Sequence, residues 1–61
     1  MYKIFNEVES KIIFESISDA EFTHFMRKIA VENDDEDLSI VCVSEAKEYL
    51  EIYCDNLKLI H

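Results

Sequence analysis

Glycine, proline and tryptophan are all absent from this 61-residue chain. A loop that cradles a phosphate needs small residues, because backbone N–H groups must approach the ligand closely. The missing glycine therefore excludes the dinucleotide fingerprint and the P-loop. Turns must use other residues instead, and asparagine tolerates a left-handed backbone. The only three asparagines, Asn6, Asn33 and Asn56, fall where the hydrophobic pattern changes, so we expect them to mark the turns.

Basic residues are scarce: six Lys and Arg stand against fourteen Asp and Glu, which gives a formal net charge of −8. This charge repels the phosphate backbone that supplies most nucleic-acid affinity, and it offers no basic cluster to an anionic membrane. No apolar run approaches the roughly 20 residues of a membrane span, and the first ten residues lack the apolar core of a signal peptide. We therefore expect a cytoplasmic protein that binds neither nucleic acid nor membrane directly.

Histidine and cysteine are also few, which limits the chemistry that the chain can perform. His24 falls on the polar face of an expected helix, and His61 is the last residue, so no Ser or Cys triad can be drawn. Cys42 and Cys54 lack the C-x-x-C spacing of redox and zinc sites, and we expect two reduced, buried thiols. The sequence predicts a protein that is not an enzyme and that needs no cofactor.

The chain is long enough for one domain, residues 1–61, with a small core. Hydrophobic residues make up 49% of the sequence, but a chain of this size buries only about 60% of its unfolded surface. Association with a second copy or another protein is a natural source of additional burial. We therefore expect a homodimer.

The first part of the chain predicts a hairpin followed by a helix. Residues 2–5 and 11–17 are rich in β-branched and aromatic residues and suit two antiparallel strands. The second run is apolar on both alternations, so we expect it to lie inside the sheet or to be covered on both faces. Ser18 with Glu21 forms a capping-box pattern, and Ile17 with Phe22 suits a hydrophobic staple. The helical stripe that follows consists of Phe22, Phe25, Met26 and Ile29.

The second part predicts a strand and another helix. Residues 38–43 are apolar on both alternations and indicate a central strand, and Ser44 is placed to cap a helix over 45–55. Residues 57–60 either form a short final strand, in a right-handed parallel unit with 38–43, or continue the helix. The predicted fold class is α+β, a small two-layer sandwich with the order β-β-α-β-α and a final strand as the open alternative.

An acidic run connects the first helix to the predicted central strand. Asp34, Asp35, Glu36 and Asp37 carry four of the eight net negative charges. The run resembles a calcium loop in composition, and Glu45 falls at the twelfth position from Asp34. A calcium loop also needs glycine at the sixth position, where this chain has Ser39. The run is therefore expected to be a solvated loop, with weak divalent-metal binding as an alternative function.

The charge distribution leads to the main functional hypothesis, a small acidic non-enzymatic protein that acts by binding another protein as a regulator, with a basic protein as the favoured partner. A nucleic-acid mimic that inhibits a basic DNA-binding protein is the alternative, although the scattered basic residues weaken it. Acids of the second helix, among them Glu51 and Asp55, extend the acidic surface. The candidate partner surface comprises Asp34, Asp35, Glu36, Asp37, Glu45, Glu48, Tyr49 and Tyr53.

Overall fold

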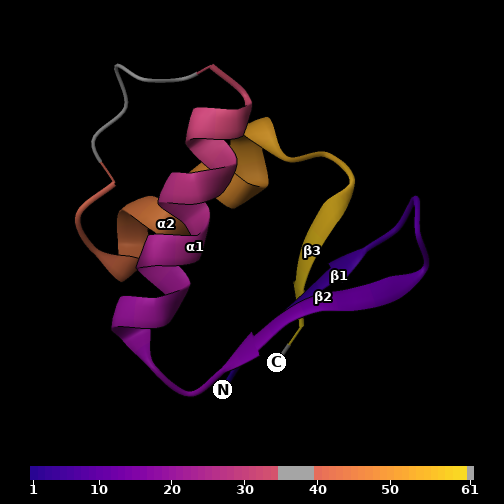
Figure 1. Cartoon of the computed structure of the whole chain (residues 1–61), viewed down its shortest axis with the longest axis horizontal. Helices are drawn as coiled ribbons and strands as arrows, with labels where there is room; N and C mark the ends of the chain where they lie inside the picture. The colour runs from indigo at the N-terminus through magenta and orange to yellow at the C-terminus, as the bar shows by residue number, and fades with distance from the viewer. Residues whose placement is uncertain (35–39, 61) are drawn as a thin grey trace.

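The computed structural model describes residues 1–34 and 40–60 of the chain. The elements follow in the order β-β-α-α-β, which confirms the predicted α+β class and differs from the predicted order in its second half. Both helices lie on the same side of a three-stranded sheet (Figure 1). The elements are β1 (Tyr2–Asn6), β2 (Lys11–Ser16), α1 (Asp19–Glu32), α2 (Val43–Tyr53) and β3 (Leu57–Ile60).

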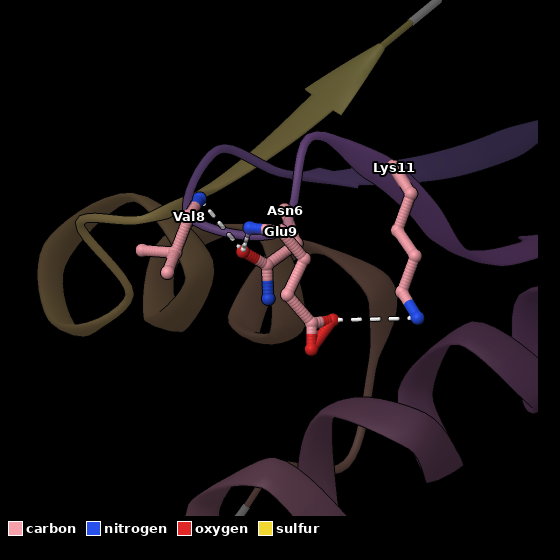
Figure 2. A network of polar contacts seen from close by, with 4 residues as sticks. All are labelled: Asn6, Val8, Glu9 and Lys11. Carbon is pink, nitrogen blue, oxygen red and sulfur yellow. Dashed lines mark hydrogen bonds and ion pairs between the residues drawn. The ribbon is translucent and has the colours of Figure 1, made fainter.

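The predicted hairpin is formed by β1 and β2, which pair antiparallel. Asn6 organises its turn through the side chain: Oδ1 accepts hydrogen bonds from the backbone N–H groups of Val8 and Glu9, at 2.9 and 3.0 Å (Figure 2). The positive φ in this turn, 56°, belongs to Ser10. Asn6 therefore marks the turn as expected, but by hydrogen bonding like an Asx turn and not by a left-handed backbone.

A β-bulge in β2 explains why its sequence is apolar on both alternations. Ile4 pairs with Phe14, but Phe5 pairs with Ile12, so Ile13 is the extra residue in the ladder. The bulge lets both Ile13 and Phe14 pack on the core, while Ile12 remains 44% exposed. The prediction that this strand lies inside the sheet was wrong. The sheet order is β2-β1-β3, so β2 is an edge strand and β1 is central.

Residues 57–60 form the short final strand, which pairs antiparallel with β1 and places Leu59 opposite Ile4. The expected parallel unit is therefore wrong. Both edges of β1 are occupied by strands that run opposite to it. The polypeptide crosses the helical layer twice between β2 and β3, through α1 and α2.

The predicted central strand over residues 38–43 is wrong for the residues that the structure describes; residues 38 and 39 lie outside them. Ile40 and Val41 have no regular secondary structure, and Val43 already belongs to α2. Ile40 is nevertheless buried, at 4% exposure, and its carbonyl accepts a 2.6 Å hydrogen bond from Nε of Arg27 on α1. Ile40 thus packs in the core without pairing in the sheet, whereas its neighbour Val41 is 68% exposed.

Helix α1 begins as the sequence predicts, with Ser18 as its N-cap. Oγ of Ser18 accepts a hydrogen bond from the Glu21 N–H at 3.2 Å, while the Ser18 N–H donates to Oγ of Ser16 at 3.0 Å. The hydrophobic staple does not form: Phe22 is fully buried but Ile17 is 80% exposed. The predicted stripe does face the core, with Phe22 and Met26 buried and Phe25 and Ile29 half-buried.

The ends of the helices differ from expectation in three places. Asn33 ends α1 with φ of −90°, and the left-handed residue is Asp34, with φ of 61°. Helix α2 has Cys42 as its N-cap, without a side-chain cap, so Ser44 lies inside the helix. Cys54 ends α2, ahead of Asn56. The Asn33 side chain has another use, because its Nδ2 donates to the Tyr49 hydroxyl at 3.1 Å and joins α1 to α2.

The core lies between the helices and the covered face of the sheet. Phe22 is its centre: its ring stacks on Tyr2 from β1 and packs at a tilt against Phe14 from β2. Since antiparallel partners share a face of the sheet, one face is turned toward the helices and the other is left uncovered. The buried apolar residues are Ile4, Phe22, Met26, Ala30, Ile40, Ala46, Tyr49, Leu50 and Cys54.

Candidate protein-interaction surface

The structure separates the residues of the predicted partner surface. Asp34, Glu45 and Glu48 are exposed. Asp35, Glu36 and Asp37 lie outside the described residues. Tyr49 is 3% exposed and belongs to the core, while Tyr53 is 54% exposed, and the two rings stack with centroids 4.9 Å apart. Of the two tyrosines, Tyr53 alone offers a large aromatic surface to a partner.

Glu45 has a structural contact at the start of α2. Its Oε1 accepts hydrogen bonds from the Val41 N–H and from Sγ of Cys42, each at 3.3 Å. A carboxylate near a helix N-terminus also interacts favourably with the helix dipole. These contacts join the Glu45 side chain to the two residues that precede α2, so its carboxylate has a role within the fold.

Tyr53 borders a hollow of about 540 Å³ at the end of the molecule where the hairpin turn, the end of α1 and the end of α2 meet. Its charged side chains are Glu9, Glu32 and Asp55, and neither Lys nor Arg lines it. Its apolar lining comes from Ile13, Phe25, Ile29, Tyr53 and Leu57, and its remaining lining residues are Asn6, Asn33, Cys54 and Asn56. We call this feature the acidic hollow.

The polar walls of the acidic hollow are held in place by local contacts. The Asn6 side chain accepts from the turn backbone, and Glu9 makes an ion pair with Lys11, with Oε2 and Nζ 3.6 Å apart (Figure 2). Asn33 is fixed by its hydrogen bond to Tyr49. Among residues 1–34 and 40–60, neither Glu32 nor Asp55 has a basic group within ion-pair distance. Two carboxylates are therefore left for a partner.

Sequence reasoning found only part of the acidic hollow. Tyr53 belonged to the predicted partner surface and Asp55 to the acidic face of the second helix, but Glu9 and Glu32 were not expected to join them. These acids come from three segments that are far apart in the sequence. The sequence does contain one signal that could have linked these acids. Each of them lies near one of the three asparagines, and all three asparagines line the hollow.

Possible metal ligands do not cluster in the described part of the chain. Within it, no group of three His, Cys, Asp or Glu side chains is placed to hold a metal ion. The Tyr2 hydroxyl donates a hydrogen bond to Asp19 at the first turn of α1. This hydrogen bond, together with burial and the negative charge of Asp19, raises the pKa of Tyr2 above 10.0, its ordinary value. That pair stabilises the core and lies outside the acidic hollow.

No family model matches the chain, and no curated protein or solved structure is significantly similar to it. Neither α1 nor α2 is long and apolar enough to cross a membrane, and no other helix is found in the described ranges.

Proposed function

We propose that this chain is a small non-enzymatic protein that acts by binding another protein, and that the acidic hollow receives a basic segment of that partner. The supporting observation is the composition of the hollow: its charged lining residues are all carboxylates, and two of them, Glu32 and Asp55, have no ion-pair partner in the described part of the chain. The hollow is complementary to a segment that carries both basic and apolar residues. Such a segment would place Lys or Arg beside Glu32 and Asp55, and an apolar side chain against the apolar lining residues. Binding of this kind suits a regulatory protein.

The two kinds of contact contribute differently. Exposed ion pairs are worth at most about 1 kcal/mol each, so the acids chiefly steer the partner and select its charge. Affinity must come mainly from apolar burial on Ile29, Phe25 and Tyr53, at about 25 cal/mol per Å² before the costs of association. We therefore expect the salt concentration to change the association rate more than the dissociation rate.

The test uses the peptide Ac-Lys-Leu-Arg-Leu-Lys-NH2 as a probe and a matched peptide with Gln at the three basic positions. Titration followed by NMR should shift the amide signals of Ile29 and Tyr53 with the basic peptide and much less with the neutral one. The double variant Glu32→Gln/Asp55→Asn should weaken binding, whereas Glu21→Gln/Glu48→Gln, with the same change in net charge, should not. Equal binding by both peptides, or equal losses in both variants, would contradict the proposal.

We also propose a homodimer, because the uncovered face of the sheet carries apolar side chains. Phe5 lies opposite Ile12 on this face and is half-buried, while Ile12 and Ile60 are 44% and 39% exposed. Exposed apolar groups of this kind are commonly interaction surfaces. Light scattering at micromolar concentration should give twice the monomer mass. Ile12→Asp should restore the monomer, while Val8→Asp in the hairpin turn should not, and a monomer for the unchanged chain would refute the dimer.

A further inference from the structure

The outer edge of β3 has backbone groups directed away from the sheet. The Glu7 N–H donates to the Asn56 carbonyl at 2.8 Å, one position beyond the pair Asn6 and Leu57. Hydrogen-bonded pairs alternate in an antiparallel ladder, so Lys58 and Ile60 bond to β1 while Leu57 and Leu59 direct their backbone groups outward. The Leu57 N–H donates to the Cys54 carbonyl at 3.1 Å. Within residues 1–34 and 40–60, the Leu57 carbonyl and both backbone groups of Leu59 have no hydrogen-bond partner and remain for another strand.

A groove follows this edge. It has a volume of about 480 Å³ and lies between α2 and β3. Leu57 and Leu59 point toward the helices and Lys58 points to the uncovered face, yet all three border the groove. The groove therefore runs along the strand edge itself. Its other lining residues, from α2, are Lys47, Leu50 and Glu51.

The opposite edge of the sheet is protected against pairing. The ladder of β2 is interrupted by the bulge at Ile13, and Lys11 and Glu15 form exposed ion pairs with Glu9 and Lys3. Bulges and charged side chains are common means of preventing edge-to-edge association. The structure records no such bulge in the pairing of β3 with β1. The two edges therefore differ in their capacity to accept a strand.

The charge beside the groove indicates what kind of strand fits. Lys47 and Lys58 line it, and neither has a carboxylate within ion-pair distance in the described part of the chain. Nζ of Lys47 lies 5.9 Å from the centre of the Tyr2 ring. With Glu51, the lining carries a net charge of +1 (two Lys and one Glu) in a chain of net charge −8. A second copy of the chain could pair its own β3 with this edge. If the two strands paired with Lys58 opposite Lys58, two positive charges would be brought together, so an acidic strand from another protein fits better.

We propose that the β3 edge and the adjoining groove accept an extended segment of a partner protein as a fourth strand, with apolar and acidic residues in alternation. The apolar side chains point toward Leu50 in the groove, and an acidic side chain lies opposite Lys58. Strand addition of this type derives affinity from main-chain hydrogen bonds and specificity from alternate side chains. This site shares only Leu57 with the acidic hollow and does not depend on the function proposed for it.

The probe is the peptide Ac-Thr-Val-Glu-Val-Thr-NH2, which can place a valine opposite Leu59 and the glutamate opposite Lys58. We expect saturable binding with Kd below about 1 mM. N-methylation of both valines should abolish binding, because the residue opposite Leu59 exchanges hydrogen bonds with it. N-methylation of the glutamate should be tolerated, because its N–H points away from β3. Equal binding by the two methylated peptides would overturn strand addition.

A second experiment reverses the charge at Lys58. Lys58→Glu should weaken binding of the probe about fivefold and favour the peptide with Lys in place of Glu. Lys28→Glu on α1 makes the same change in net charge away from the groove and should leave binding unchanged. Hydrogen exchange tests whether the probe binds at the β3 edge. The Leu59 amide should exchange rapidly in the free protein and more slowly after the probe is added. The absence of binding, or a Leu59 amide already protected in a peptide-free dimer, would overturn the proposal.

Discussion

The Tyr2 ring of β1 lies flat on the Phe22 ring of α1, with the centroids 4.5 Å apart and the planes 6° from parallel. The Tyr2 hydroxyl also donates a hydrogen bond to Asp19 of the same helix. The central strand is thus joined to the first two turns of α1 by an apolar contact and a polar one. The stability of the domain should depend strongly on this junction.

Replacement of Phe22 by Ala should remove most of the stability of the domain. Phe22 is fully buried, and truncation of such a side chain costs about 3–5 kcal/mol. A domain of this size has a total free energy of unfolding of about 3–9 kcal/mol. Urea denaturation followed by circular dichroism measures the change. Ile17→Ala is the control and should cost less than about 0.5 kcal/mol, whereas a large loss there would mean that the staple forms after all.

The Tyr2–Asp19 hydrogen bond predicts a dependence of stability on alkaline pH. The pKa of Tyr2 is raised in the folded protein, chiefly by this hydrogen bond. Its contribution is complete below the ordinary tyrosine pKa of 10.0 and is lost as the pH rises through the higher folded value. NMR titration of the tyrosine rings should show Tyr2 ionising above 10.0, and Asp19→Asn should lower its pKa. An unchanged pKa in that variant would contradict the assignment.

The two serines that the sequence places at helix starts should respond differently to mutation. Ser18→Ala removes the hydrogen bond to the Glu21 N–H and should destabilise the domain by about 1 kcal/mol. Ser44→Ala should have a much smaller effect, because Ser44 lies inside α2 and, among the described residues, its Oγ makes a hydrogen bond only with Sγ of Cys42, at 3.3 Å. Thermal unfolding of the two variants gives the comparison. Equal losses would restore Ser44 as the cap of α2.

The two cysteines should be distinguishable by their reactivity. Cys42 is exposed and Cys54 is buried, so the expectation that both would be buried holds only for Cys54. Ellman's reagent should modify one group per chain in the native protein and two after unfolding. Cys42→Ser should eliminate the native reaction and leave one group after unfolding. Two groups reacting at once in the native protein would contradict the burial of Cys54.

The parts of the fold that depend on local signals could be predicted from the sequence. The capping serine of α1, its apolar stripe and the hairpin all follow from spacing along a short segment. An apolar pattern on both alternations was interpreted as a central strand in two segments, residues 11–17 and 38–43, and both interpretations were wrong. In β2 it reflects the bulge that directs Ile13 and Phe14 to one face, and at Ile40 it reflects a buried loop residue held by Arg27. Neither the bulge nor the hydrogen bond between Arg27 and Ile40 has a distinctive pattern in the local sequence.

The candidate site was less accessible to sequence reasoning for the same physical reason. The acidic run drew attention because its charges are consecutive, yet the acidic hollow collects Glu9, Glu32 and Asp55 from separate turns. Tyr49 and Tyr53 are one helical turn apart, and spacing alone could not decide which of them the core would take. Only the packing of α2 against α1 places Tyr49 inside.

The position of β1 between β2 and β3 has a consequence for biosynthesis. As the chain leaves the ribosome, β1 can pair with β2 almost at once, but its other edge stays open until residues 57–60 have been made. During that interval the nascent chain presents an unpaired edge next to the apolar residues that later close the core. Such edges are prone to pair with other chains. Slow translation of the codons for residues 41–60 should therefore favour aggregation, and a chaperone that covers β1 should counteract it.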